Sequence, residues 1–278
     1  MEIRIATLDD WEMLSVFYHK IYRENHPLQH KEFWKWQFGN PEYGNAIIAI
    51  SDNKIAAHLG VSIADGYAWH INLFVLEEWR NVPVLPALIK KADAFGKPGN
   101  LSANRDAVNL YRSLKWYQYA NLERRICVRH DLADAAIQNI LLPVSTDEKI
   151  LSPEGHFWQQ PGLEPAIFED GSTAILQKNV GGVRFVSIND IKKAAAQCFD
   201  MGFHWCDYVT SFNNPILRKL ERNHWKDETE QQIPWLLNPV VHHSKSNLTF
   251  LTQEPIPIDF YINRLHSDLG RIGSLPKE

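Results

Sequence analysis

The residues best suited to chemistry gather in one stretch, residues 68–118, in which a strand-like run leads through a polar turn into a helix. His70 lies near the start of that run and Glu77 lies in the turn, and either side chain could take a proton from a substrate. Arg80 follows, just before the helix that we predict from Pro83. The start of a helix presents free N–H groups and a partial positive charge. Together with a guanidinium group, it is typical of a binding site for diphosphate.

Aromatic rings mark a second candidate region. Trp34 and Trp36 lie in the short segment Lys31–Phe38, where they could stack on a sugar or a nucleobase. His58, in a predicted hairpin, is a further candidate for contact with the substrate. Each of these side chains could instead be buried in the core, which is the more common place for large aromatic residues.

The histidines and cysteines predict no metal site. Neither the pair His242-His243 nor the pair formed by His266 and Asp268 has a spacing suited to zinc. The three cysteines form no CxxC motif and are few for 278 residues, which indicates a reducing compartment. The sequence also lacks the GxSxG and Walker A motifs.

The composition is typical of a soluble globular protein, and the few cysteines add the expectation of a cytoplasmic location. Hydrophobic residues make up 45% and charged residues 22%, and the net charge is −4 at pH 7 with no basic run. We therefore expect no nucleic-acid partner. The first residues lack the apolar core of a signal peptide, and no 18-residue apolar run occurs. We therefore expect neither secretion nor a membrane span.

The elements that would position the chemical residues form a mixed α/β unit over residues 1–130. Alternating polar and apolar residues predict strands, whereas apolar residues three or four apart predict helices. The crossover from strand through helix to strand is expected to be right-handed. The predicted order is strand 2–6, helix 10–23, short helix 31–38, strands 46–51, 54–63 and 70–76, helix 83–95, strand 100–103, helix 106–114 and strand 122–129.

A second α/β pattern follows a connector of residues 131–160. The order of its elements resembles that of the first half, and the sequence alone leaves open whether this is a repeat. We predict a smaller second domain of similar pattern over residues 161–278. Its predicted elements are a hairpin at 165–178, a strand at 182–188, a helix at 191–201, a strand at 205–210, a helix at 216–223 and two β-rich runs at 232–238 and 247–252.

With its elements in this order, the first half resembles the GNAT superfamily of acyltransferases, which use acetyl- or acyl-coenzyme A. One family motif, (Q/R)xxGx(G/A) between a splayed strand and a helix, aligns with Leu73–Leu85. A second motif is an asparagine followed by an apolar helix that carries a tyrosine. It aligns with Asn104, Tyr111 and the aromatic pair Trp116-Tyr117. The segment KEFWKWQFGNPEYG also resembles part of the bacterial members found in surface-sugar pathways.

The resemblance implies a site for acetyl-CoA, or for another acyl-CoA, and a role for each matched residue. Tyr111 would be the general acid that protonates the leaving thiolate, with Glu77 or His70 as the candidate base. Asn104 would hydrogen-bond the pantetheine arm, and the backbone of the preceding strand would pair with that arm like an added strand. The other residues expected to contact the cofactor are Phe74, Val75, Arg80, Asn81, Val82 and Val84.

The sequence departs from the family motif at the start of the predicted helix. Pro83 and Leu85 replace the two glycines of the motif, and Pro86 follows. Each proline lacks an N–H, and the leucine side chain adds bulk where the backbone should approach the phosphates. Either the cofactor is held by fewer donors, or the site no longer binds coenzyme A.

The residues and the resemblance together support three hypotheses. The first is an N-acyltransferase, most simply an N-acetyltransferase, that modifies the primary amine of a small molecule such as an amino sugar on a nucleotide. The second is a non-catalytic binding module that keeps the fold and has lost the coenzyme A site. The third is an acyl-transfer protein that uses a different donor. Each hypothesis leaves open whether the protein forms a homodimer.

Overall fold

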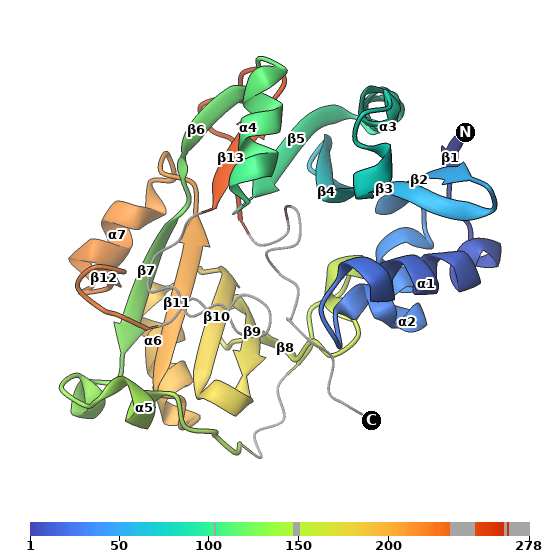
Figure 1. Ribbon diagram of the computed structural model, residues 1–278. Helices are drawn as coiled ribbons and strands as arrows, with labels where there is room; N and C mark the ends of the chain where they lie inside the picture. The colour runs from blue at the N-terminus through green and yellow to red at the C-terminus, as the bar shows by residue number, and fades with distance from the viewer. Residues whose placement is uncertain (103, 147–150, 234–247, 264–265, 267–278) are drawn as a thin grey trace.

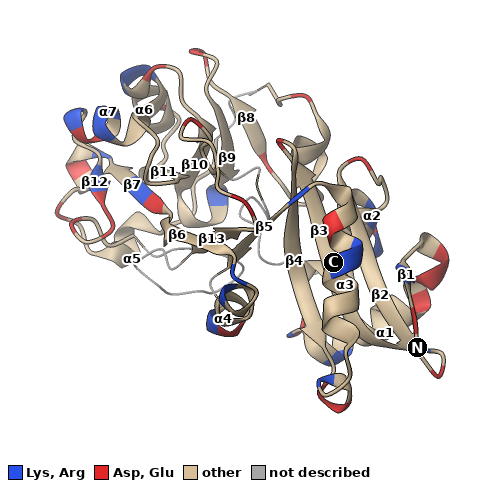
Figure 2. Ribbon diagram, turned by 90° about the horizontal axis from the view of Figure 1, so that it is seen from above, with Lys and Arg blue, Asp and Glu red and all other residues tan. Residues whose placement is uncertain are grey.

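The chain folds into two mixed β-sheets, and helices cover each of them (Figure 1). The chain crosses from one sheet to the other between consecutive strands. The computed structural model describes residues 1–102, 104–146, 151–233, 248–263 and 266. The predicted mixed α/β class, with a second part of similar pattern, is confirmed. Acidic and basic residues are mixed along both halves of the chain, as Figure 2 shows.

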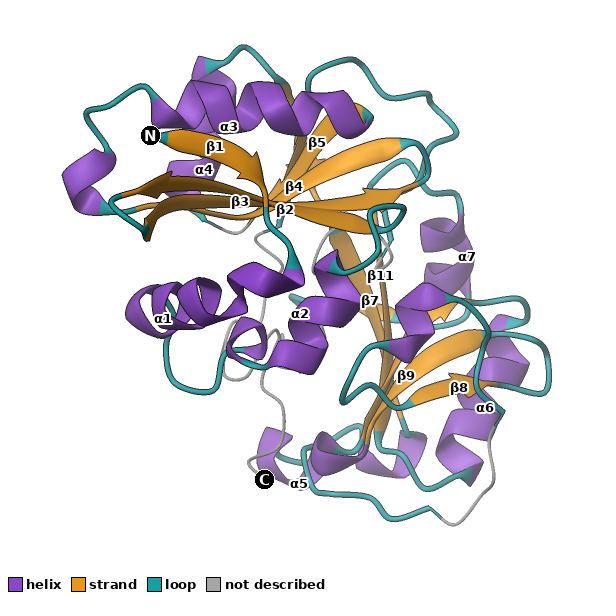
Figure 3. Cartoon of the chain, turned by 90° about the vertical axis from the view of Figure 1, so that its right-hand side faces the viewer, coloured by secondary structure: helices purple, strands orange, loops and turns teal. Residues whose placement is uncertain are grey.

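The first sheet contains seven strands and carries helices on both faces (Figure 3). Its strands are β1 (Glu2–Ile5), β2 (Gly44–Ser51), β3 (Lys54–Ala64), β4 (Tyr67–Val75), β5 (Lys97–Ser102), β6 (Tyr117–Asn121) and β13 (Thr249–Thr252). Its helices are α1 (Trp11–Ile21), α2 (Lys31–Phe38), α3 (Val84–Ala92) and α4 (Arg105–Ser113). The strand order is β1-β2-β3-β4-β5-β13-β6.

The spacing of apolar residues explains which face each element buries. α3 buries Val84, Leu88 and Ala92, which recur every four residues, against one face of β2 and β3. α1 and α2 pack on the opposite face of the same strands. Because both faces are covered, these strands are apolar along most of their length instead of alternating with polar residues.

The second sheet contains six strands in the order β12-β7-β11-β10-β9-β8. Its core is a parallel pair, β10 and β11, connected by a helix whose buried face contacts both strands. The strands are β7 (Glu123–Val128), β8 (Pro165–Ile167), β9 (Thr173–Gln177), β10 (Gly182–Ser187), β11 (Trp205–Thr210) and β12 (Lys226–Asp227). The helices are α5 (Ile137–Ile140), α6 (Ile191–Asp200) and α7 (Ile216–Arg222).

Each sheet is completed by a strand from the other half of the chain. β7 follows directly after β6 in the sequence, yet it pairs with β11 and β12 in the second sheet. β13, near the end of the chain, pairs with β5 and β6 in the first sheet. The two halves therefore exchange strands, as Figure 1 shows. Sheet membership thus does not coincide with the predicted division of the chain at residue 130.

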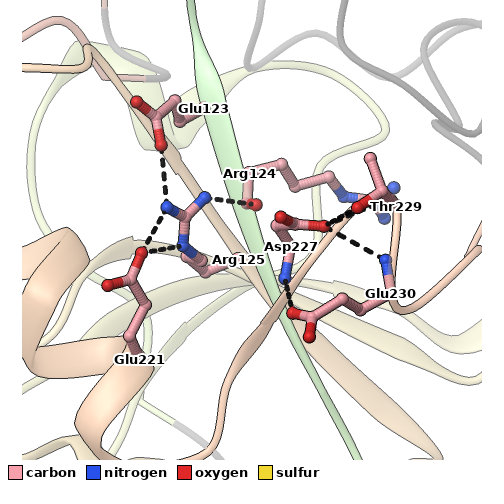
Figure 4. A network of polar contacts seen from close by, with 7 residues as sticks. All are labelled: Glu123, Arg124, Arg125, Glu221, Asp227, Thr229 and Glu230. Atoms are coloured by element: carbon pink, nitrogen blue, oxygen red, sulfur yellow. Dashed lines mark hydrogen bonds and ion pairs between the residues drawn. The ribbon is translucent and has the colours of Figure 1, made fainter.

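Polar contacts of Arg125 anchor β7 in the second sheet (Figure 4). Its guanidinium group binds Glu123 at 2.8 Å and Glu221 at 2.6 Å. Glu221 belongs to α7, so this ion pair ties the exchanged strand to a helix of the other half. On the neighbouring strand β12, Asp227 accepts a hydrogen bond from the backbone N–H of Thr229 and closes the turn that follows.

A buried charged cluster aligns three strands of the second sheet. Arg124 on β7 donates from Nε to Asp207 Oδ2 on β11 at 2.8 Å. Arg184 on β10 places its Nε 3.4 Å from the same oxygen. Both guanidinium groups lie 5.8 Å from the ring centre of Trp205. Because an uncompensated charge would be costly in the core, these contacts favour one register of the three strands.

The sequence does not predict two short strands, β6 and β12. β6 lies at the edge of its sheet and is mostly exposed, so it lacks an alternating apolar pattern. β12 contains only two residues and is defined by its pairing with β7. The predicted helix at 83–95 is confirmed as α3 followed by a 3-10 turn, Asp93–Phe95. The β-rich run predicted at 232–238 lies largely outside the described residues.

Candidate functional site

A cavity of about 420 Å³ opens where β4 and β5 diverge. The two strands pair in parallel from Tyr67 to His70 on β4 and from Lys97 to Asn100 on β5. Beyond the His70–Asn100 pair they separate. The second half of β4, the end of β5, α4 and the end of α1 with the segment that follows it form the walls.

A bulge in β4 lies at this point of divergence. Asn72 has a positive φ of 51°, and the register against β3 shifts between the partners of His58 and Gly60. Asparagine is one of the few residues besides glycine that tolerates this left-handed conformation. The bulge bends β4 away from β5 and so helps to open the cavity.

A chain of buried hydrogen bonds supports the bulge from behind. Trp34 Nε1 donates to Tyr18 Oη at 3.1 Å, Tyr18 Oη lies 2.9 Å from His58 Nε2, and His58 Nδ1 lies 2.9 Å from the carbonyl oxygen of Asn72. A carbonyl can only accept, so Nδ1 carries the hydrogen and Nε2 accepts from the tyrosine hydroxyl. Burial lowers the pKa of His58 to about 4, which keeps its ring neutral near pH 7.

We expect Tyr18→Phe to lower the free energy of unfolding by about 1–3 kcal/mol, because it leaves the His58 acceptor and the Trp34 donor buried without a partner. Urea denaturation followed by far-UV circular dichroism measures this change. Tyr43→Phe is the matched control, since Tyr43 is exposed and its hydroxyl group makes no hydrogen bond to any residue that the structure describes. Equal unfolding free energies for the two variants would contradict the supporting role of this network.

His70 and Tyr111 meet at the floor of the cavity. His70 Nδ1 lies 3.2 Å from Tyr111 Oη, and both side chains are fully buried. Burial raises the pKa of Tyr111, and the nearby Asp93 carboxylate raises it further, so the phenol stays protonated at neutral pH. Burial also lowers the pKa of His70 to about 3, so the ring is neutral. The site thus holds a protonated phenol beside a neutral imidazole.

Two further residues at this site are not among those expected from the sequence. Asp93 Oδ1, at the end of α3, lies 3.7 Å from His70 Nε2. Asn100 Nδ2 donates to the carbonyl of His70 at 2.8 Å, which holds the last pair of β4 and β5 together. Asn100 Oδ1 has no hydrogen-bond partner among the described residues and could accept one from a ligand. No sequence spacing relates these residues to His70, because sheet pairing and helix packing bring them together.

The start of α3 offers few donors for a phosphate group. Pro83 and Pro86 have no N–H, and the N–H of Val84 donates to the carbonyl of Val82 at 2.7 Å. At most the N–H of Leu85 remains in the first turn. Arg80 is partly engaged as well, because its Nε donates to the carbonyl of Val75 at 3.3 Å.

The structure separates the predicted site residues into four places. His70, Tyr111, Phe74 and Asn104 line the cavity, and the Asn104 side chain also caps α4 by accepting from the N–H of Asp106. Trp34 and His58 are buried behind the bulge, where they shape β4 without lining the cavity. Trp36 lies in a different pocket. The remaining predicted residues follow the divergent end of β4, up to the start of α3, and are Val75, Glu77, Arg80, Asn81, Val82 and Val84.

Trp36 belongs to an aromatic pocket of about 220 Å³ between α2 and the connector. Its indole Nε1 donates to the carbonyl of His156 at 2.7 Å. The His156 ring stacks on Trp36, with ring centres 5.4 Å apart, and on Tyr43, with ring centres 4.2 Å apart. These rings already stack on one another, and the indole N–H already has a hydrogen-bond partner. The predicted contact of Trp36 with the substrate therefore stays a prediction.

The described residues contain neither a metal-binding cluster nor a membrane-spanning helix. Within the described residues, no group of three or more His, Cys, Asp or Glu side chains is placed to share a metal ion. Among the helices that the structure describes, none combines the length and apolar character needed to cross a membrane.

Proteins of known structure that resemble this chain include GNAT-family acetyltransferases. A candidate acetyltransferase from Pyrococcus horikoshii matches 99% of this chain and 93% of its own, at 10% identity and a TM-score of 0.47. An acetyltransferase of the GNAT family from Streptococcus pneumoniae matches 44% and 87%, at 16% identity and a TM-score of 0.35. An aminoglycoside 6'-N-acetyltransferase from Acinetobacter haemolyticus matches 42% and 91%, at 18% identity and a TM-score of 0.36. No protein-family model and no curated protein matches the sequence.

Proposed function

We propose that this protein is an N-acyltransferase that moves an acyl group, most simply acetyl, from acyl-coenzyme A to a primary amine. One observation carries the proposal: a protonated phenol, Tyr111, beside a neutral imidazole, His70, at the floor of a cavity between two diverging strands. A cavity with a few convergent polar groups whose pKa values are shifted is the usual form of an active site.

The proposed reaction is direct attack by the amine on the thioester. The amine nitrogen forms a bond to the acyl carbon, and the bond from that carbon to sulfur breaks. Tyr111 donates its proton to the departing thiolate, which would otherwise be a poor leaving group in a buried site. The side of β4 that faces the cavity is not paired with β5 beyond His70, so its backbone can pair with the pantetheine arm as an added strand would.

The acceptor amine would enter from the side of α1. There the rings of Tyr22 and His26 stack with centres 3.9 Å apart and form part of the cavity wall. Flat aromatic surfaces of this kind suit a sugar ring, so we favour an amino sugar, such as one carried on a nucleotide, over an amino acid or peptide amine.

We expect the acyl-pantetheine part, and not the diphosphate, to supply most of the donor affinity. Because α3 offers at most one free N–H and Arg80 already contacts Val75, acetyl-CoA and S-acetylpantetheine should bind with dissociation constants within about tenfold, the worth of one ordinary hydrogen bond. Isothermal titration calorimetry measures both.

A blocking variant of α4 tests the location of this binding. Ala107 lines the cavity, so Ala107→Trp should abolish the heat of binding for both ligands. Asn109→Trp places the same side chain on the exposed side of the helix and should leave binding intact. Absence of binding by the unchanged protein at millimolar ligand would refute the proposed function.

The second candidate function is a non-catalytic binding module that has lost the coenzyme A site. The two prolines at the start of α3 favour it, together with the contact of Arg80 with the backbone. Gain of acetyl-CoA binding on Pro83→Gly with Leu85→Gly, in a protein that otherwise has none, would support this function. Turnover by the unchanged protein would exclude it.

A further inference from the structure

We propose that Asp93 and His70 form the exit route for the proton that the acceptor amine gives up, with Tyr111 as the group that contacts the amine. We call these three residues the proton relay. The inference rests on the proposed function and extends it, because it assigns the base and the path to solvent. His70 and Asp93 act through Tyr111 and are therefore positioning residues.

The geometry of His70 connects a buried hydroxyl to a carboxylate near the surface. One ring nitrogen, Nδ1, lies 3.2 Å from Tyr111 Oη, and the other, Nε2, lies 3.7 Å from Asp93 Oδ1. The His70 side chain has no exposed area, whereas the Asp93 side chain is 32% exposed. A neutral imidazole can accept a proton at one nitrogen while it releases another from the opposite side.

The two atoms that face each other across 3.7 Å are both unsatisfied. His70 Nε2 and Asp93 Oδ1 are buried, and neither has a hydrogen-bond partner within the described part of the chain. A buried polar atom without a hydrogen-bond partner lowers the stability of the fold, and each of these two atoms could serve as the partner of the other. A shortening of about 0.7 Å would bring the pair to ordinary hydrogen-bond length.

The protonation of the pair follows from its neighbours. The titratable groups that face His70 in the described residues are Asp93 and Tyr111. With Asp93 ionised, the ring carries its hydrogen on Nε2, toward the carboxylate, and accepts from the tyrosine hydroxyl at Nδ1. This is the arrangement by which a carboxylate orients an imidazole as base in acyl-transfer triads.

The relay moves one proton in a balanced sequence. As the amine nitrogen bonds to the acyl carbon, an N–H bond breaks and its proton passes to Tyr111 Oη. The former hydroxyl proton passes to His70 Nδ1, and the Nε2 proton passes to Asp93, which releases it to solvent. Tyr111 again carries a proton, which it gives to the thiolate when the bond from carbon to sulfur breaks. Tyr111 then takes back the proton on His70 Nδ1, while Nε2 takes one from solvent through Asp93. All three residues return to their starting state, and the net result is one proton moved from nitrogen to sulfur.

Burial of His70 favours passage of the proton over its storage. The low pKa of this ring makes a long-lived imidazolium costly, so the ring accepts and releases its protons in one event. Burial raises the pKa of Asp93, which makes its carboxylate a better proton acceptor than an exposed aspartate.

The first test reads the protonation of His70 without any substrate. A long-range ¹H–¹⁵N correlation spectrum, with the His70 signals assigned through a His70→Gln variant, shows which ring nitrogen carries hydrogen. We expect the Nε2–H form in the unchanged protein and a shift away from it in Asp93→Leu. Asp9→Asn, at an exposed position, is the control and should leave the signals unchanged. A ring protonated at Nδ1 in the unchanged protein would overturn the relay.

The second test is kinetic and separates proton transfer from mere support of the fold. Asp93→Asn keeps the size of the side chain but cannot pass a proton, so we expect kcat to fall by about 100-fold with KM for donor and amine unchanged. Asp93→Glu restores a carboxylate and should recover much of this loss. If Asp93→Asn kept the kcat of the unchanged protein, the proton relay would be refuted and the proposed function would stand. If the unchanged protein showed no turnover, both the proposed function and the proton relay would be refuted.

Discussion

A fragment that ends at residue 130 is expected to lose cooperative folding. In the intact chain β13 lies between β5 and β6 and supplies Phe250 and Leu251 to the apolar clusters on the two faces of the first sheet. Leu248 and Ile262 from the same part of the chain are buried beside them. The burial of four such side chains contributes about 6–12 kcal/mol to the free energy of unfolding, which is comparable to the whole free energy of unfolding of a typical domain.

The fragment would also carry a strand without its sheet. β7 pairs with β11 and β12, so in the fragment its buried residues Arg124 and Ile126 would face water or another molecule. An unpaired strand presents free backbone N–H and C=O groups that can pair with another molecule, which promotes aggregation. We therefore expect low solubility as well as the absence of a sigmoidal thermal transition.

Thermal unfolding by circular dichroism, with residues 1–263 as the comparison, measures this effect. Addition of a peptide of residues 248–263 should restore part of the transition, because it supplies β13 in trans. The same peptide with Phe250→Ser is the matched control and should restore less, since it lacks the fully buried ring. A fragment 1–130 that unfolds cooperatively at the temperature of the longer chain would show that the exchanged strand is dispensable.

Tyr111→Phe is expected to lower kcat by about 10²–10⁴-fold, the range that a positioned general acid contributes. The substitution removes only the hydroxyl group, so the shape of the cavity and the binding of acyl-CoA should persist. Release of the free thiol of coenzyme A, measured with a panel of amino sugars and amino acids, gives kcat. Calorimetry with acetyl-CoA tests that binding is retained.

The control for this variant is Tyr117→Phe, which makes the same change at a half-exposed position on β6. Loss of the hydrogen bond between Tyr111 and His70 should cost about 1–3 kcal/mol of unfolding free energy, because it leaves the buried His70 Nδ1 without its partner. A fall in kcat with a near-normal free energy of unfolding therefore indicates that the Tyr111 hydroxyl group takes part in the reaction. Equal kcat for the two variants would remove Tyr111 from the mechanism.

The local elements follow from the sequence because their causes are local. The helix α6 begins where Asp190 caps the N–H groups of Lys192 and Lys193, and such a cap can be recognised from residue type alone. The tight turn between β2 and β3 is similarly marked by Asp52 and Asn53, which both adopt positive φ. The prediction of a mixed α/β fold rests on patterns of this range.

Part of the candidate site was also within reach of the sequence. The motif around Asn104 and Tyr111 places a tyrosine on a helix beside a divergent strand, and His70 is a recognisable proton carrier on that strand. Pro83 and Pro86 predict weak binding of phosphate at the start of this helix, because a proline never has a backbone N–H to donate. The structure adds that Val82 takes one of the remaining donors of that turn.

The membership of the strands and the contacts of His70 were decided only by the tertiary structure. The residues of β7 are compatible with a strand, but its backbone can pair with any strand, so residue type does not select β11 over a neighbour in the first sheet. Asp93 reaches His70 from the far end of α3, and Tyr111 reaches it from α4, 41 residues along the chain. The sequence determined the elements and the residues able to carry protons. The packing of helices against strands decided which of those residues meet, because it depends on the whole core and not on spacing.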